Sequence, residues 1–138
     1  MNNTKKGRVD ISELNTPPEK HEYDTAKYFA ERGYDVVFVK PSNIKGQNSP
    51  DFEMGGKIWE TKSPTGSSER VFDNNFRKAM KQSEHIIFDL RRMKKQNEVW
   101  CLNKINRQKS SCKIKTLLVI TGDGRLLICK GKFDIIKA

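Results

Sequence analysis

The chain has 138 residues, the length of one ordinary domain, which argues against two domains and allows a core without disulfide or metal support. Lysine and arginine number 27 against 17 aspartate and glutamate, a formal charge of +10 that favours polyanionic partners over a merely soluble basic protein. The three cysteines lack C-x-x-C spacing, no apolar run approaches the roughly 18 residues of a membrane span, and the N-terminal MNNTKKGRVD lacks the apolar stretch of a signal peptide. These features argue against a disulfide framework, a zinc finger and a membrane partner.

The first predicted element is a helix over residues 17–32. Thr16 is a candidate N-cap, Pro17 suits the first helical turn, and Glu19 completes a capping box. Apolar residues then recur at helical spacing until Gly33, which is a natural C-terminal stop.

Three strands are predicted next. Residues 35–40 form a β-branched and aromatic run of strand length. Two shorter candidates, 51–54 and 57–62, are separated by Gly55-Gly56, which is a hairpin signal.

The second half of the chain continues in the same alternating manner. Residues 69–84 have helical periodicity, 85–90 are strand-like, and 97–107 can form a short helix. Residues 114–120 and 125–130 are apolar strands, joined by a Thr-Gly-Asp-Gly turn.

This order predicts an α/β or α+β domain with one mixed sheet, flanked by helices and followed by an appended C-terminal helix and β-hairpin. Residues 1–15 are polar and aperiodic, so we expect a flexible N-terminal lead-in. A single domain is then expected over 16–138.

The residues with the clearest chemical potential are Asp51, Glu60 and Lys62. Glu60 and Lys62 are two apart in a predicted strand and therefore share a face, while Trp59 points the other way. The hairpin can bring Asp51 beside them. Two converging carboxylates repel each other unless a cation lies between them, and a hard cation such as Mg²⁺ prefers one or two carboxylates plus waters. Such an ion activates water, and a neighbouring lysine can stabilise charge on a phosphate, so the set fits phosphodiester hydrolysis.

Pro50-Asp51 followed by Glu60-Thr61-Lys62, within this order of helices and strands, resembles the PD-(D/E)XK nuclease superfamily. The resemblance implies that Asp51 and Glu60 hold a divalent metal, most simply Mg²⁺ with Mn²⁺ or Zn²⁺ as alternatives, and that Lys62 serves the nucleophilic water. It also implies a further acidic ligand from the first helix, for which Glu22 is the candidate and Glu19 the reserve. The second helix would supply polar or basic catalytic residues, here Lys78 and Gln82.

A narrower resemblance rests on several longer stretches. They are His21-Glu22-Tyr23-Asp24-Thr25-Ala26, Gly33-Tyr34-Asp35-Val36, Trp59-Glu60-Thr61-Lys62-Ser63-Pro64, and Lys81-Gln82-Ser83 ahead of Ile86-Ile87-Phe88-Asp89-Leu90. They look like the tRNA-nuclease domains at the C-termini of contact-dependent growth inhibition toxins. The resemblance implies tRNA as substrate, a cognate immunity protein as partner, and action in the cytoplasm as a delivered fragment of a larger toxin. This sequence shows no delivery module, and members of the wider superfamily often cut DNA.

The basic residues outside the motif are candidates for holding the nucleic-acid backbone. They are Arg77, Lys81, Arg91, Arg92, Lys94 and Lys95.

Alternatives remain at the sequence level. A DNA endonuclease of the same fold, of the restriction, repair or mobile-element kind, fits the same residues. A non-catalytic nucleic-acid-binding domain is the rival from another class. Asp51, Glu60 and Lys62 could also form a surface charge cluster on a hairpin, and Lys78 and Gln82 could be plain exposed helix residues.

Overall fold

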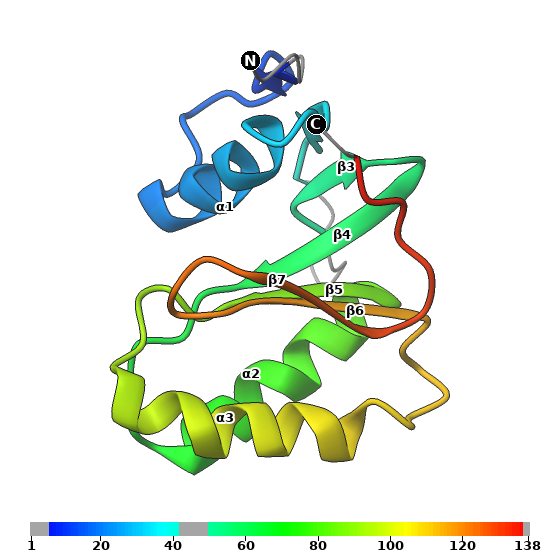
Figure 1. Cartoon of the computed structure of the whole chain (residues 1–138). Coiled ribbons are helices and arrows are strands. Elements are labelled where there is room, and N and C mark those ends of the chain that lie inside the picture. The colour runs from blue at the N-terminus through cyan, green and yellow to red at the C-terminus, as the bar shows by residue number, and fades with distance from the viewer. Residues whose placement is uncertain (1–5, 42–49, 137–138) are drawn as a thin grey trace. The chain divides into compact units, whose positions relative to one another are not determined.

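A computed structural model describes residues 6–41 and 50–136 of the chain (Figure 1). The chain forms two compact units. The N-terminal unit comprises Met1–Trp59 together with Asp134–Ala138, and the C-terminal unit comprises Glu60–Phe133.

The N-terminal unit contains one helix and the first strands of the chain: β1 (Val9–Asp10), α1 (Lys20–Ala30), β2 (Val36–Phe38), β3 (Phe52–Met54) and the first half of β4 (Lys57–Lys62). Strand β1 pairs with β2 in parallel, whereas β2 with β3 and β3 with β4 are antiparallel. The β3–β4 hairpin turns at the predicted glycine pair, where both glycines have positive φ angles that other residues rarely adopt.

Strand β1 lies within the stretch expected to be a flexible lead-in. The Arg8 carbonyl accepts a hydrogen bond from the Val36 amide at 2.8 Å, and the Arg8 amide donates to the Asp35 side chain at 2.9 Å. Two paired residues are too few to produce a periodic pattern, so this strand has no signature in the sequence.

Helix α1 is shorter than the predicted span of 17–32, and Thr16 is not its N-cap. The N-cap is Glu19, whose side chain accepts from the backbone of Glu22, while the Glu22 side chain accepts from the Glu19 amide at 3.2 Å. Pro18 accounts for the difference, because a proline disfavours helical backbone at the residue before it, here Pro17. The capping box is therefore present but begins at Glu19.

The C-terminal unit contains the remaining elements: the end of β4, α2 (Glu69–Gln82), β5 (His85–Asp89), α3 (Lys95–Gln108), β6 (Thr116–Ile120) and β7 (Leu126–Lys130). Strand β4 neighbours β5, β5 and β6 are parallel, and β6 and β7 form an antiparallel hairpin. Helix α3 thus connects the parallel strands β5 and β6 as their crossover. The hairpin that was predicted as an appendage is therefore part of the sheet, and the helix predicted with it is a connection between two strands of that sheet. The hydrogen-bonded strand order follows the chain from β1 to β7, which confirms the mixed α+β class.

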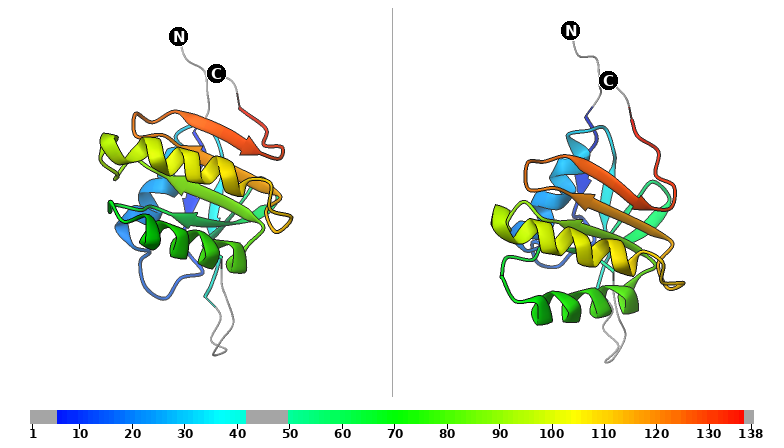
Figure 2. Two further views of the ribbon diagram at one scale, coloured as in Figure 1. Left: turned by 90° about the horizontal axis from the view of Figure 1, so that it is seen from below. Right: turned by 60° about the horizontal axis from the view of Figure 1, so that its bottom comes forward.

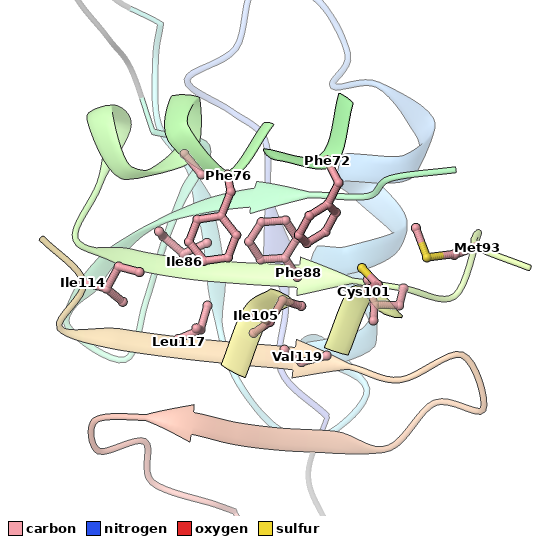
Figure 3. Close-up of a cluster of buried hydrophobic side chains, with 12 residues drawn as sticks. Phe72, Phe76, Ile86, Phe88, Met93, Cys101, Ile105, Ile114, Leu117 and Val119 are labelled. Carbon is pink, nitrogen blue, oxygen red and sulfur yellow. The ribbon is translucent and has the colours of Figure 1, made fainter. Parts of the chain in front are cut away.

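The core of the C-terminal unit lies between its helices and β5–β6. Helices α2 and α3 lie side by side on one face of these strands (Figure 2). Phe72 and Phe76 of α2 meet Phe88 of β5, with 4.9 Å between the stacked ring centroids of Phe76 and Phe88, and Ile105 of α3 and Val119 of β6 complete the cluster (Figure 3). This packing holds α2 against the strands, and with it the position of Gln82.

In the part of the chain that the structure describes, no helix is long and apolar enough to span a membrane.

Candidate functional site

Glu60 is a buried carboxylate in the C-terminal unit. It lies in β4 and is only 3% exposed. Its Oε2 atom is 3.1 Å from Nζ of Lys62, so the two side chains point the same way, as the two-residue spacing predicts. A buried charge is tolerated only when it is paired, and Lys62 supplies the opposite charge.

Gln82 supplies a second donor to the same carboxylate. It is the last residue of α2, and its amide nitrogen, when oriented toward Glu60, donates to Oε2 and also to Oε1 at 2.8 Å. Both oxygens of Glu60 are therefore held by donors from a strand and a helix, which fixes the carboxylate in one orientation. Lys78, one turn earlier on α2, is exposed.

Glu22 and Asp51 form a second acidic pair, within the N-terminal unit. Glu22 lies in the first turn of α1, and its side chain is hydrogen-bonded to that of Asp51, just before β3. Burial raises the pKa of Glu22 to about 7, and the hydrogen bond and negative charge of Asp51 act in the same direction. Glu22 therefore keeps its proton to a higher pH than an ordinary glutamate.

A backbone hydrogen bond of the β3–β4 hairpin holds Asp51 within the N-terminal unit. The Asp51 amide donates to the carbonyl of Trp59 at 2.9 Å, and Trp59 directly precedes Glu60 in β4. Glu19, the reserve for Glu22, is the N-cap of α1, and its Oε2 atom lies 3.3 Å from Nε2 of His21. Glu22 is therefore the acid of α1 that meets Asp51.

The donor chemistry of the Glu22–Asp51 pair suits a hard cation. Two neighbouring carboxyl groups offer oxygen ligands of the kind Mg²⁺ takes, alongside water, and a cation between them would offset the repulsion of their charges. Within residues 6–41 and 50–136, no group of three or more His, Cys, Asp or Glu side chains is gathered in a metal-binding arrangement. Glu22 and Asp51 are two carboxyl groups, the number that Mg²⁺ commonly takes from a protein beside water and substrate oxygens.

Arg91 and Arg92 differ in their surroundings, although both were predicted to contact nucleic acid. Arg91 donates two hydrogen bonds to the buried side chain of Asp89, with Nε at 3.0 Å from Oδ1 and Nη2 at 2.8 Å from Oδ2. Arg92 instead donates through Nη1 to the carbonyl of Ser63 at 3.3 Å, next to Lys62 in the chain. Asp89 was missed from the sequence, although an Asp that ends an apolar strand two residues before an Arg could have revealed the pair.

The other predicted nucleic-acid contacts share an exposed position on the C-terminal unit. They are Arg77, Lys81, Lys94 and Lys95. The C-terminal unit has 17 basic residues (Lys and Arg) against 7 acidic residues (Asp and Glu), whereas the N-terminal unit has 10 basic and 10 acidic residues. The entire net charge of +10 therefore belongs to Glu60–Phe133.

Comparisons with known proteins place the chain among toxin domains. The family model described as the contact-dependent growth inhibition CdiA C-terminal domain matches residues 48–126, more than half of the chain. A solved structure of a CdiA-CT/CdiI toxin and immunity complex from Burkholderia pseudomallei has a similar fold, with a TM-score of 0.60 and 19% sequence identity. The alignment covers 88% of this chain and 98% of that one. No curated protein matches the sequence.

Proposed function

The chain belongs to the family of contact-dependent growth inhibition CdiA C-terminal domains, and from that premise we propose that it is a metal-dependent endonuclease of the PD-(D/E)XK type that cleaves tRNA. As a toxin domain of this family it would act in the cytoplasm of the cell it enters. Asp51, Glu60 and Lys62 are the central catalytic residues of this proposal.

The observation that carries the proposal is the arrangement around Glu60. A carboxylate that served only the fold would be costly to bury, since an apolar side chain of similar size stabilises a core as well or better. Glu60 is nevertheless held in one orientation by Lys62, the lysine of the PD-(D/E)XK-like motif, and by Gln82, one of the two polar or basic candidates on the second helix. A fixed carboxylate beside a fixed ammonium is a preorganised polar site, the feature that electrostatic catalysis depends on.

Glu22 and Asp51, the two acids that lie together, would hold the metal, and Glu60 is proposed as a further ligand. The ion, when bound, lowers the pKa of its water ligand and offsets negative charge on the scissile phosphate. Glu22 would hold the ion as an ionised carboxylate, and Lys62 would place its Nζ ammonium to orient water or stabilise charge on the phosphate oxygens. Gln82 keeps Glu60 in position, and Lys78 is proposed to contact the phosphate from the same helix.

The charge distribution supports nucleic acid as the substrate. A unit that has all of the net +10 charge attracts a polyanion, and its exposed arginines and lysines can neutralise backbone phosphates. The choice of tRNA over DNA rests on the resemblance of the motif-bearing stretches to tRNA-nuclease toxins.

A cognate immunity protein is the proposed partner. The similar structure from Burkholderia pseudomallei is of a toxin and immunity complex. By the same logic, an acidic immunity protein would bind the basic surface of this C-terminal unit and block substrate binding.

The test is incubation of the purified chain with labelled tRNA and, separately, with plasmid DNA, each with Mg²⁺ and with EDTA. Cleavage of tRNA that EDTA abolishes is the expected result. Glu60→Gln should be inactive, whereas Glu53→Gln, which removes an exposed carboxylate from the neighbouring β3, should retain activity. Cleavage of plasmid alone would indicate a DNA endonuclease, and binding of either polymer without cleavage would contradict the enzymatic proposal.

A further inference from the structure

A cavity of about 250 Å³ opens beside the Glu22–Asp51 pair, and both of these residues line it. It lies wholly within the N-terminal unit. Its remaining walls are largely apolar and include Leu14, Pro17, Phe38, Val39 and Pro50. The volume is below the roughly 300–1,000 Å³ of pockets that take drug-sized ligands, so the cavity suits a single small ring system.

The charged groups of this cavity are acceptors of hydrogen bonds. Glu19, Glu22 and Asp51 contribute three carboxyl groups, and no lysine, arginine or histidine is among the described residues that line the cavity. A phosphate would be repelled by this lining. An uncharged group with flat apolar faces and N–H donors along one edge would be accepted, and a nucleobase has these properties.

The walls are also stiff. Proline has a fixed φ angle, and prolines stand both ahead of α1 and before Asp51. A pocket that is already formed loses little conformational entropy when a flat ring enters it.

We propose that this cavity binds the base of the nucleotide adjacent to the cleaved phosphodiester, and that Glu19 selects a base with an exocyclic amino group. The inference rests on the proposed nuclease function, which it deepens by adding a base-recognition subsite. Because Glu22 and Asp51 line the same cavity, a base seated there brings its own phosphate next to the proposed metal ligands.

Glu19 is the carboxylate that remains for the base once Glu22 and Asp51 bind metal. Its side chain accepts from the Glu22 amide and lies 3.3 Å from His21 Nε2, but a carboxylate has about four lone-pair sites and can accept further donors. Guanine offers two adjacent N–H donors to such a group, cytosine and adenine offer an amino group, and uracil offers a single imide N–H. Guanine is therefore the preferred base.

The test uses short RNA substrates with a single abasic nucleotide placed in turn at each position around the cleaved bond. The abasic nucleotide should reduce the cleavage rate of the wild-type protein roughly 10- to 100-fold at one position only, because stacking of a single base strengthens binding on that scale. Leu14→Trp, which fills the cavity, should cleave intact and abasic substrates equally slowly. Ile11→Trp adds the same ring at an exposed residue outside the cavity and should behave as wild type.

Glu19→Gln isolates the selection of the base. It replaces one acceptor oxygen with a donor and should reduce the preference for guanine over uracil at that position at least several-fold, while Glu13→Gln, at an exposed residue outside the cavity, should not. An unchanged preference in Glu19→Gln would overturn the assigned role of Glu19.

Binding provides a readout that does not need cleavage. Titration of guanosine into metal-free protein should shift the NMR methyl signals of Leu14 and Val39, and Leu14→Trp should abolish the shift at Val39. If the protein cleaves RNA with no position-specific abasic effect, the subsite is overturned and the nuclease proposal stands. If it cleaves nothing, the nuclease proposal falls, and the absence of guanosine shifts would overturn the base pocket as well.

Discussion

Glu22 and Asp51 share a hydrogen bond between side chains that come from the start of α1 and the residue before β3. Burial first, and then the hydrogen bond and charge of Asp51, raise the pKa of Glu22 from 4.5 to about 7. Glu22 thus keeps its proton well above the pH at which a glutamate usually loses it, and this property leads to measurable consequences.

The first prediction concerns the pH dependence of stability in EDTA. An acid whose pKa is raised in the folded state binds more protons there than in the unfolded chain. Its contribution to the stability of the folded state is therefore complete below about pH 4.5 and is lost as the pH rises through about 7. The melting temperature of wild type should therefore fall between these values relative to that of Glu22→Gln, which has no such proton. Thermal unfolding of both proteins at pH 4 to 8 measures the effect. Parallel curves would contradict the raised pKa of Glu22.

The second prediction concerns the metal. Mg²⁺ should raise the melting temperature of wild type, because a ligand present at 100 times its Kd stabilises the folded state by about 2.7 kcal/mol. Asp51→Ala should show no such rise, and should be inactive. In EDTA, however, Asp51→Ala should melt at or above wild type, since it removes the carboxylate that destabilises ionised Glu22. An Asp51→Ala protein that still responds to Mg²⁺ would remove Asp51 from the set of ligands.

Glu60→Ala should behave differently in EDTA. Without Glu60, the partly buried amine of Lys62 and amide of Gln82 lose their acceptor, and a fully buried donor without a partner costs about 1–3 kcal/mol, which is the upper limit here. Glu60→Ala should therefore melt below wild type, and Glu60→Gln should lose less. Two acids that look equivalent in the motif are expected to have opposite effects on stability. Equal melting temperatures for Glu60→Ala and wild type would contradict this packing.

The sequence was informative where a pattern is local. The helix–strand order and the shared face of Glu60 and Lys62 follow from periodicity and spacing. The predicted start of α1 was wrong by several residues, because Thr16 and Pro17 match a generic cap pattern while Pro18 overrides it. Strand β1 and the parallel pairing of β6 with β5 depend on long-range contacts that leave no local signature.

Roles within the candidate site were harder to predict. Arg91 and Arg92 are adjacent and identical in type, so the sequence does not distinguish them. The structure shows that Arg91 is the one that forms an ion pair with the buried side chain of Asp89. Likewise, the choice of Glu22 over Glu19 depends on which acid of α1 meets Asp51. In each case two residues looked alike in the sequence, and only the packing shows which of them contacts Asp89 or Asp51.

The two arginines give the next prediction. Arg91→Ala removes the two hydrogen bonds that the guanidinium donates to the Asp89 carboxylate. It should therefore reduce the free energy of unfolding by about 2–3 kcal/mol. Arg92→Ala should leave the free energy of unfolding within about 0.5 kcal/mol of wild type and should weaken nucleic-acid binding. The slope of log affinity against log salt concentration should become shallower by about one, which corresponds to the loss of one phosphate contact. Urea unfolding and binding titrations at several salt concentrations separate the two effects. A salt slope unchanged by Arg92→Ala would exclude it from the backbone footprint.

The last prediction separates catalysis from binding at Lys62. Its ammonium lies 3.1 Å from Glu60 Oε2 and its side chain is 22% exposed, so it is held by the buried carboxylate while remaining accessible to a substrate. If it acts on the transition state, Lys62→Ala should reduce kcat by about 10²- to 10³-fold and leave substrate affinity nearly unchanged. Lys62→Arg should restore only part of the rate, because a planar guanidinium cannot occupy the position of a compact ammonium. Lys57→Ala, at the other end of β4, is the matched control for loss of a lysine and should retain activity. Single-turnover cleavage and binding measured on the same folded proteins give the two quantities separately. A folded Lys62→Ala protein that cleaves at the wild-type rate would show that Lys62 only neutralises Glu60, and would overturn the assignment of this strand to the active site.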